Sequence, residues 1–353
     1  MPVESATTEL SLPGLEVTPT APASKPNHWI ERGPQKRLMV FSGRSHTDLA
    51  LRIAEHLGVE LGDVELKTFA NDETYVRYSE SIRGADVFIV QTGAEPVDRN
   101  LMELLLMIQA AKLASAKRIT AVIPWFPYSR QDRKAKPREP ISGRLVADML
   151  QLAGADRVLT MDLHAGQIQG FFTVPVDHMT ALPLFGRHFR DLGFVGEGVV
   201  SVAPDAGRAR VAVRFAEMLE ADFAVMHKTR PAHDALPVTE ITGRVRDKIA
   251  IVGDDVTTTG NTLIAGAQAL KEHGAKDVWI FVTHAQLNAE GLERLGNADV
   301  AGIVVTDTLP IDPLTRPDNM TVLPVAGLLA ETIMNVFADD SVSAIFGGDT
   351  QLF

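Results

Sequence analysis

The chain has 353 residues, of which 45% are hydrophobic and 22% are charged, so it is long enough to bury a large core and to form two domains. It has no cysteine, which excludes a disulfide framework, a thiolate metal site and a cysteine nucleophile. The formal net charge of -11 argues against duplex nucleic acid as a partner, because binding to a phosphate backbone depends on Lys and Arg. No apolar run approaches the length of a membrane span, and no basic start leads into an apolar stretch as in a secretory signal. We therefore expect a cytoplasmic protein with no nucleic-acid partner and no membrane partner.

Residues 1–35 differ in composition from the rest of the chain. Their prolines are scattered among Ser, Thr and Ala with little hydrophobic periodicity. Such a segment cannot bury enough apolar surface to order itself, so we expect a disordered tail.

After the tail, short β-rich runs alternate with helical patterns. Leu38 to Phe41 precedes the helical pattern of Thr47 to Leu57, and Val87 to Val90 precedes that of Leu101 to Ala114. This alternation predicts a mostly parallel sheet covered by helices on both faces.

An internal repeat supports a division into two halves. QAAKLASAK (Gln109 to Lys117) and QALKEHGAK (Gln268 to Lys276) agree at five of nine positions, and each leads into an apolar strand. Chance could produce one such match in an Ala-rich chain, but a duplicated unit explains it as well. The repeat suggests two similarly folded α/β halves, separated near Ala181 to Gly186.

Two segments concentrate positive charge in an otherwise acidic chain. Phe126 to Pro140 carries five Lys and Arg side chains, and His227 to Pro237 opens with Lys228 and Arg230 directly after a strand. Most charge runs are solvated faces. A loop bracketed by prolines after a sheet edge, however, suits a mobile segment that closes over a polyphosphate.

Polar residues end two further apolar strands. Leu159 to Gln167 contains Asp162 and His164, and Val199 to Gly207 contains Asp205. Ligands in open parallel sheets gather at the carboxyl ends of strands, and an imidazole with carboxylate oxygens would suit a Mg²⁺ that takes its other ligands from water and a nucleotide. The alternative is that His164 is a hydrogen-bonded core histidine and Asp205 a helix cap.

The segment Val252 to Thr262, VGDDVTTTGNT, carries the most specific pattern. An apolar run (Ile249 to Val252) leads into Asp254 and Asp255, then into a Thr/Gly stretch and a helical run. The loop and the helix N-terminus behind it favour a phosphate, and adjacent carboxylates accept hydrogen bonds from vicinal hydroxyls. A sugar phosphate is the implied ligand, although an Asp-Asp pair after a strand is often only a turn and an N-cap. Two cationic loops facing such a site would imply phosphoryl chemistry.

From about Arg37 to Phe346, the chain resembles the ribose-phosphate pyrophosphokinase family, phosphate-activated class, which makes phosphoribosyl pyrophosphate (PRPP). The strings that carry the resemblance are FANDET (Phe69 to Thr74), ESIRG (Glu80 to Gly84), MELLLMI (Met102 to Ile108), SRQDRK (Ser129 to Lys134), TMDLHAGQIQGFF (Thr160 to Phe172), APDAG (Ala203 to Gly207), HKTR (His227 to Arg230) and SVSAIF (Ser341 to Phe346). The resemblance implies an α/β fold with a tandem pair of type I phosphoribosyltransferase-like domains, each a mostly parallel sheet flanked by helices. We expect the tail over 1–35, an ATP-side domain over 36–182, a ribose 5-phosphate-side domain over 183–338, and a segment over 339–353 that packs back on the N-terminal domain.

The resemblance also implies a role for each matching position. The expected ATP-binding residues are Phe69, Asn71 and Glu73, which reach the site from a neighbouring subunit, together with Arg130, Gln131, Asp132 and His164. The expected Mg²⁺ ligands are His164 and Asp205, and the expected catalytic cations are Lys228, Arg230 and Arg130. Asp254 and Asp255 match the acids on the ribose hydroxyls, and Thr258, Thr259, Gly260, Asn261 and Thr262 match the 5-phosphate loop. The implied reaction is in-line attack of the C1 hydroxyl of ribose 5-phosphate on the β-phosphorus of ATP, which releases AMP.

Regulation and assembly are implied in the same way. The positions that match a regulatory site for inorganic phosphate and ADP are Ser81, Arg83, Arg138, Gln169, Asp177, Ser341 and Ser343. The adenine segment implies a dimer at least, and the family implies a homo-hexamer built as a trimer of dimers.

The chain departs from the family at several positions of the site. Thr258 stands where an Asp is usual, and Asn261 stands where a Gly is usual. Arg208 replaces a common glycine, Gly253 replaces a β-branched residue, and Asp72 replaces Gly or Gln. Because Asn tolerates left-handed backbone angles, a phosphate loop could survive at Asn261.

Three functions are compatible with these patterns. The first is an active pyrophosphokinase, since the basic loops, the metal pair and the adenine segment are intact. The second is a weakly active or regulatory paralogue that assembles with an active synthetase, because the sugar loop is altered. The third is a phosphoribosyltransferase that consumes PRPP, which would need neither the duplicated domain nor the adenine segment.

Overall fold

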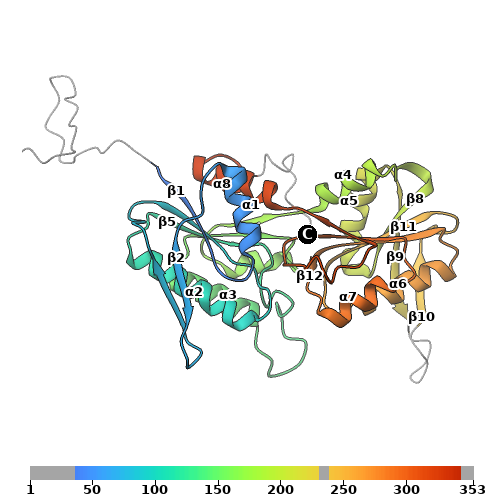
Figure 1. The fold of residues 1–353 in the computed structure, drawn as a ribbon. Helices are drawn as coiled ribbons and strands as arrows, with labels where there is room; N and C mark the ends of the chain where they lie inside the picture. The colour runs from blue at the N-terminus through green and yellow to red at the C-terminus, as the bar shows by residue number, and fades with distance from the viewer. Residues whose placement is uncertain (1–35, 230–237, 343–353) are drawn as a thin grey trace, which may run out of the picture. The chain divides into compact units, whose positions relative to one another are not determined.

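The computed structural model describes residues 36–229 and 238–342, so the tail expected over residues 1–35 lies outside it. The helices are α1 (Thr47–Leu57), α2 (Val97–Leu113), α3 (Ser142–Ala153), α4 (Leu182–Asp191), α5 (Ala209–Leu219), α6 (Asn261–Glu272), α7 (Ala289–Gly296) and α8 (Ala326–Ala338), with short 3-10 helices η1 (Gly166–Phe171), η2 (Gly196–Gly198) and η3 (Ala206–Arg208) (Figure 1). The strands are β1 (Leu38–Ser42), β2 (Val64–Thr68), β3 (Thr74–Tyr78), β4 (Asp86–Val90), β5 (Arg118–Ile123), β6 (Arg157–Met161), β7 (Val176–Met179), β8 (Val199–Ala203), β9 (Asp222–Thr229), β10 (Val238–Thr242), β11 (Ile249–Thr257), β12 (Asp277–Ala285), β13 (Gly302–Thr306) and β14 (Met320–Leu323). None of the helices in these two ranges is long and apolar enough to cross a membrane.

Two main sheets share one strand order. The first runs β1-β4-β5-β6-β7 with every pairing parallel, and the second contains the parallel series β8-β11-β12-β13-β14. Corresponding strands are followed by corresponding helices, so that α1, α2 and α3 match α5, α6 and α7. The halves differ at their hairpins, because β2 and β3 form a separate sheet whereas β9 and β10 extend the second sheet. The two similarly folded, mostly parallel halves expected from the repeat are confirmed.

The repeated sequences occupy equivalent places, each between the end of a helix and the start of a strand. The seventh residue of each copy has a left-handed backbone, Ser115 with φ 62° and Gly274 with φ 89°. The next N–H in each copy donates to a carbonyl five residues back, Ala116 to Ala111 and Ala275 to Leu270. This shared helix end turns the chain into β5 in one half and into β12 in the other.

Helices cover both faces of each sheet (Figure 1). α2 and α3 enclose one core with the first sheet, and α6 and α7 enclose another with the second. The opposite faces of both sheets share a single apolar cluster with α1, α4, α5 and α8. Val40 and Phe88 face this shared cluster, while their neighbours Phe41 and Ile89 face the α2 and α3 side. Because the shared cluster runs across the boundary expected at 182/183, that boundary stays a prediction.

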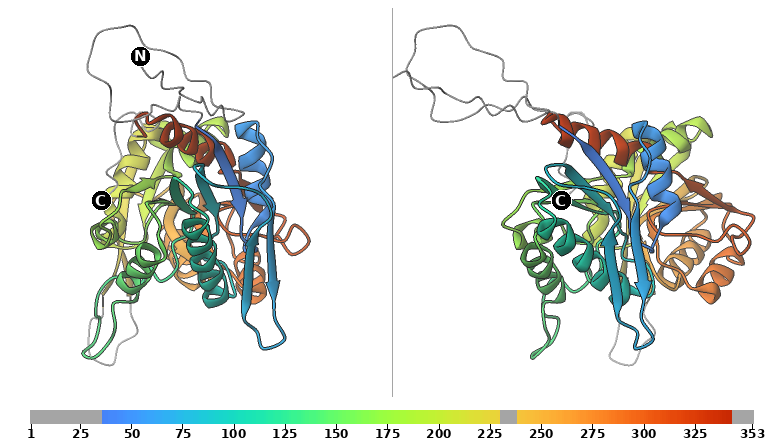
Figure 2. Two further views of the ribbon diagram at one scale, coloured as in Figure 1. Left: turned by 90° about the vertical axis from the view of Figure 1, so that its left-hand side faces the viewer. Right: turned by 60° about the vertical axis from the view of Figure 1, so that its left-hand side comes forward.

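The end of the described chain returns to the first sheet. α8 packs beside α1 (Figure 2). Asp339, directly after α8, forms ion pairs with Arg118 of β5 at 2.6 Å and with Lys36. The expectation that residues 339–353 pack on the first half stays a prediction, because residues 343–353 lie outside the described chain.

A polar seam, which we define as Asp162, Thr283 and His284, joins the two sheets at the ends of their strands. The Thr283 hydroxyl donates to Asp162 Oδ2 at 2.7 Å, and His284 Nε2 donates to the carbonyl of Met161 at 3.0 Å. Burial lowers the pKa of His284, so the ring is neutral there. These contacts fix the carboxyl edge of β6 against that of β12, where the candidate site lies.

Candidate active site

The acid pair lies on a strand rather than in a loop. We expected the strand to end at Val252, but β11 continues to Thr257, since its parallel pairing with β12 extends through both acids. Asp255 is 5% exposed, whereas Asp254 is partly exposed. The two carboxylates are therefore held by a sheet, at its carboxyl edge as expected.

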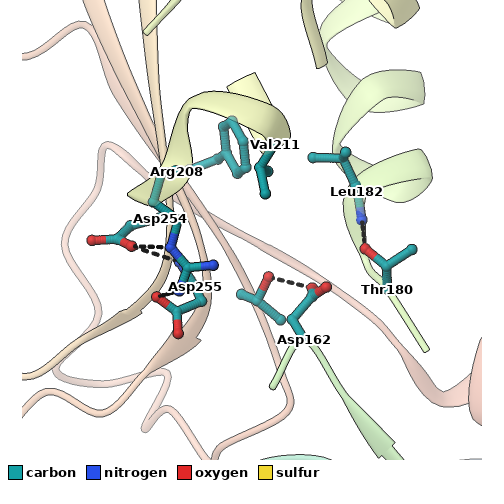
Figure 3. A pocket seen from close by; sticks show the side chains of 9 residues that line it. Asp162, Thr180, Leu182, Arg208, Val211, Asp254 and Asp255 are labelled. Carbon is teal, nitrogen blue, oxygen red and sulfur yellow. Dashed lines mark hydrogen bonds and ion pairs between the residues drawn. The ribbon is translucent and has the colours of Figure 1, made fainter. Parts of the chain in front are cut away.

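Arg208 reaches this acid pair from η3 (Figure 3). Its Nε lies 3.4 Å from Asp254 Oδ1, and its Nη2 forms an ion pair with Asp255 Oδ1. The Arg208 side chain is only 12% exposed. The Asp205 carboxylate caps η3 by accepting from the backbone N–H of Arg208 at 3.2 Å. Sequence reasoning noted Arg208 only as a replaced glycine and missed its position between the acids.

His164 approaches the same pair from the first half of the chain. Its Nδ1 lies 2.7 Å from Asp255 Oδ2. Burial alone would raise the pKa of Asp255, but the hydrogen bond from His164 and the charge of Arg208 outweigh burial and hold it below its ordinary value. Burial and the neighbouring charge of Asp255 raise the pKa of Asp254 well above its ordinary value. The pair therefore favours one negative charge over two, and that charge lies on Asp255.

The space beside the acids is small. A cavity of about 20 Å³ is lined by the side chains around Arg208 and the polar seam, including Thr180, Val211 and Phe281. A space of this size holds about one water molecule. With Arg208 in this position, the space that remains between the guanidinium and the carboxylates is far smaller than a sugar.

Core packing explains the departure at Gly253. A Cβ at this position would lie 2.1 Å from Cζ of Phe281, well inside van der Waals contact. The Phe281 ring cannot easily retreat, because it packs against Phe215 and Phe185 with centroid separations of 4.5 Å and 4.7 Å. Gly253 and Phe281 therefore form a complementary pair, and the missing β-branched side chain is a packing feature.

The phosphate loop over Thr258 to Thr262 leads into the N-terminus of α6 as expected. Its left-handed residue is Gly260, with φ 76°, whereas Asn261 is the first residue of α6. The loop therefore does not use the tolerance of Asn261 for left-handed angles, because Gly260 supplies that conformation. The Asn261 side chain instead accepts from Arg294 of α7 at 2.9 Å. Sequence reasoning missed Arg294, because its spacing from Glu290 is typical of a surface ion pair.

Of the expected metal pair, only His164 contacts the acids, and the two residues do not form a complete metal site. Asp205 is exposed and caps η3, as its alternative interpretation had it. The His164 side chain is 36% exposed and is bonded to Asp255, so it is hydrogen-bonded without being a core residue. Among residues 36–229 and 238–342, no group of three or more His, Asp or Glu side chains could hold a metal ion. The donor set nevertheless fits a metal that takes further oxygens from a nucleotide, since Asp255 orients the His164 ring and Nε2 has no partner in the part of the chain that the structure describes.

The expected adenine residues lie at the tip of the β2–β3 hairpin (Figure 2). Phe69 is 51% exposed and contacts Tyr75 of the same hairpin, and Asn71 Oδ1 accepts from the backbone of Glu73 at 3.4 Å. Asp72 has φ 70°, which explains why Gly is common there and why Asp, a tolerant residue, is accepted. The hairpin therefore exposes this segment, as binding from a neighbouring subunit would require.

The first basic loop borders a larger hollow. Arg130 and Gln131 line a space of about 320 Å³ together with Trp125 and Gln286, and Gln286 belongs to the second half. Asp132 accepts from Gln167 at 2.5 Å. The volume is within the range of small-molecule sites.

The remaining expected residues are placed only in part. Lys228 belongs to β9 and its backbone pairs with that of Thr239, but its side chain and the whole of Arg230 lie outside the described residues, as does Ser343. Among the expected regulatory residues, Asp177 pairs with Arg157 at 2.6 Å, Arg83 donates to Ser115, and Gln169 donates to the Gly166 carbonyl. The Ser341 carbonyl accepts from Asn335, and the Ser81 carbonyl accepts from Arg37. Arg138 is exposed and has φ 71°. None of these contacts joins two of the expected regulatory residues, so the regulatory site stays a prediction.

Comparisons with known proteins agree on one family. Residues 38–154 match the model of the N-terminal domain of ribose phosphate pyrophosphokinase, and residues 228–347 match that of the phosphoribosyl synthetase-associated domain. The chain is 45% identical over 307 residues to a ribose-phosphate pyrophosphokinase of Fusobacterium nucleatum, covering 87% of this chain and 97% of the relative. It is 46% identical over 325 residues to that of Corynebacterium efficiens, covering 91% and 99%. The crystal structure of phosphoribosylpyrophosphate synthetase from Mycobacterium smegmatis superposes with a TM-score of 0.80 at 45% identity, covering 86% of this chain and all of that one. The chain therefore belongs to the ribose-phosphate pyrophosphokinase family.

Proposed function

We propose that this protein transfers the pyrophosphoryl group of ATP to the C1 hydroxyl of ribose 5-phosphate, giving PRPP and AMP for nucleotide biosynthesis. The observation that carries the proposal is the acid pair on β11, followed by the loop that starts α6. The chain that holds this site is about 45% identical to ribose-phosphate pyrophosphokinases along nearly their whole length. The regulatory-paralogue alternative is not favoured, because the relatives that match over most of the chain carry the name of the enzyme. A phosphoribosyltransferase that consumes PRPP would not need the matching N-terminal half.

The residues divide between the two substrates. Asp254 and Asp255 would accept hydrogen bonds from the ribose hydroxyls, and the backbone N–H groups around Gly260 at the start of α6 would hold the 5-phosphate. The hollow beside Arg130 would take the nucleotide. Lys228, Arg130 and Arg230 would balance the negative charge that develops on the transferring group, which is the main task of a protein in phosphoryl transfer.

Mg²⁺ is the cofactor that best fits the available donors. His164 and Asp205 would hold it together with ATP oxygens, and when bound it would neutralise charge on the phosphates. Asp255 would keep the His164 ring oriented through its 2.7 Å hydrogen bond. We expect His164→Ala to keep its circular dichroism spectrum while requiring a higher Mg²⁺ concentration for half-maximal rate, and an unchanged Mg²⁺ dependence would contradict the assignment.

Assembly follows from the exposed hairpin. Phe69, Asn71 and Glu73 would complete the ATP site of a neighbouring subunit, within a homo-hexamer built as a trimer of dimers. Sedimentation velocity should therefore find no fully active monomer. Inorganic phosphate and ADP are proposed as effectors that bind at Ser81, Asp177 and the other expected regulatory residues. A cytoplasmic location remains a prediction from composition.

The decisive experiment measures AMP. The full chain is incubated with ATP, ribose 5-phosphate and Mg²⁺, with and without inorganic phosphate, and AMP and PRPP are quantified together. We expect equal amounts of the two products, and their loss in the double variant Asp254→Asn with Asp255→Asn. A chain that binds ATP but forms no AMP under either condition would refute the proposed function.

A further inference from the structure

The oxygens of the acid pair are almost fully used by the protein itself. Asp255 Oδ1 is paired with Arg208, and Asp255 Oδ2 is bonded to His164. Asp254 Oδ1 accepts from the backbone N–H of Asp255 at 2.9 Å and also faces Arg208 Nε. Within the described part of the chain, only Asp254 Oδ2 has no partner, whereas two vicinal hydroxyls need an acceptor each.

Arg208 also fills the space that a ligand of the acid pair would need. The cavity left around it measures about 20 Å³, while ligand sites usually measure about 300–1,000 Å³. η3 is capped by Asp205, so its backbone fixes where the Arg208 side chain starts. A sugar could therefore reach the acids only if the guanidinium moves away.

The Arg208 contact is one that a ligand can replace. Nη2 is buried and faces Asp255 only as an ion pair, with no partner in hydrogen-bond geometry among the described residues. Charge attraction alone therefore holds Nη2 at Asp255, and a guanidinium that moved into solvent would gain hydrogen bonds to water. Sugar hydroxyls, by contrast, could donate to the carboxylates in good geometry.

We propose that Arg208 is an intramolecular competitor for the sugar: its guanidinium occupies the acid pair of the ribose subsite, and ribose 5-phosphate binds only by displacing it. Arg208 thereby sets the affinity of this chain for the sugar, so the protein responds only to high concentrations of ribose 5-phosphate. Arg208 does not line the hollow beside Arg130, so we expect the affinity for ATP to change little with this exchange. This inference rests on the proposed function for the identity of the sugar.

The test compares sugar binding among matched variants. Ribose 5-phosphate is titrated calorimetrically into the full-length wild-type protein, Arg208→Gly and Arg208→Gln, all with Mg²⁺ and without ATP. We expect the Kd to fall at least tenfold in Arg208→Gly, and also in Arg208→Gln, which keeps much of the side-chain bulk and guards against a folding defect of the glycine variant. Arg144→Gln removes an exposed arginine paired with Asp148 on α3 and should leave the Kd unchanged.

Steady-state kinetics separate this exchange from a structural effect. In both Arg208 variants the KM for ribose 5-phosphate should fall while the KM for ATP stays within about twofold, a split that a general loss of structure would not produce. A Kd that is unchanged or weaker in both variants, or no measurable sugar binding by any of them, would overturn the inference. If wild type makes AMP and the variants bind sugar no more tightly, only the inference fails. If no protein makes AMP but the variants bind sugar more tightly, the inference stands and the proposed function fails.

Discussion

The pairing of Gly253 with Phe281 can be tested by restoring the side chain that the family usually has. In Gly253→Val, the new Cβ would lie 2.1 Å from the ring, so the ring would have to retreat by about 1.3 Å to reach an ordinary contact of 3.4 Å. Phe185 and Phe215 block that movement. Overpacking of this kind costs about 3 kcal/mol, and replacing a strand glycine by valine returns about 1 kcal/mol, so we expect a net loss of about 2 kcal/mol.

The reciprocal change should reverse the sign of this effect. Phe281→Ala alone removes a ring that is 3% exposed and should cost about 4 kcal/mol through the cavity it leaves. In the double variant, valine fills part of that cavity without a clash. We expect the double variant to lose about 3 kcal/mol rather than the sum of the single losses, which is a coupling of about 3 kcal/mol.

Urea unfolding followed by far-UV circular dichroism measures this cycle, at one fixed protein concentration because assembly would add a concentration dependence. The control cycle combines Gly253→Val with Phe41→Ala, since Phe41 packs against the α2 and α3 side of the other sheet. The control should be additive within about 0.5 kcal/mol. Additivity of Gly253→Val with Phe281→Ala would refute the packing argument.

Three further outcomes are expected. Burial lowers the pKa of His178 to about 4, and its Nε2 accepts from the Leu163 N–H at 2.9 Å. The free energy of unfolding should therefore fall by about 3 kcal/mol as the pH drops from 6.5 to 4. In His178→Gln this pH dependence should flatten in urea titrations, and an unchanged slope would assign it to other groups. Lys228→Ala should reduce kcat about 10²-fold with the sugar KM nearly kept, whereas a loss confined to KM would make Lys228 a ground-state binder. Thr258→Asp should lower the sugar KM about 5- to 30-fold, because a carboxylate accepts more strongly than a hydroxyl by roughly 1–2 kcal/mol, and a variant with an unchanged KM would refute that account.

Local pattern was enough to predict the architecture. We could predict the alternation of strands and helices, the repeat, and the position of the carboxylates at a strand end. All three depend on hydrophobic periodicity and on neighbours in the chain, which can be read directly from the sequence. The repeat even marks equivalent helix ends at Ser115 and Gly274. A serine at this position does not by itself predict a left-handed backbone, whereas a glycine does.

Long-range placement of side chains could not be predicted in the same way. Arg208 and Asp255 are 47 positions apart in the chain, and they meet because β8, which η3 follows, pairs with β11 in the sheet. The fit of Gly253 to Phe281 depends on the register between two strands, as does the continuation of β11 past Val252. A family pattern marks such positions as unusual but cannot say whether the cause is catalysis or packing.

The polar seam limits how far this protein can be treated as two modules. Cutting the chain between the halves would separate Asp162 from Thr283 and His284 from the Met161 carbonyl. Buried groups that lose their partners cost about 1–3 kcal/mol each, and the shared apolar cluster would be opened at the same place. Neither half should therefore survive as an autonomous folding unit, and grafting one half onto a foreign partner would require the seam to be rebuilt with it.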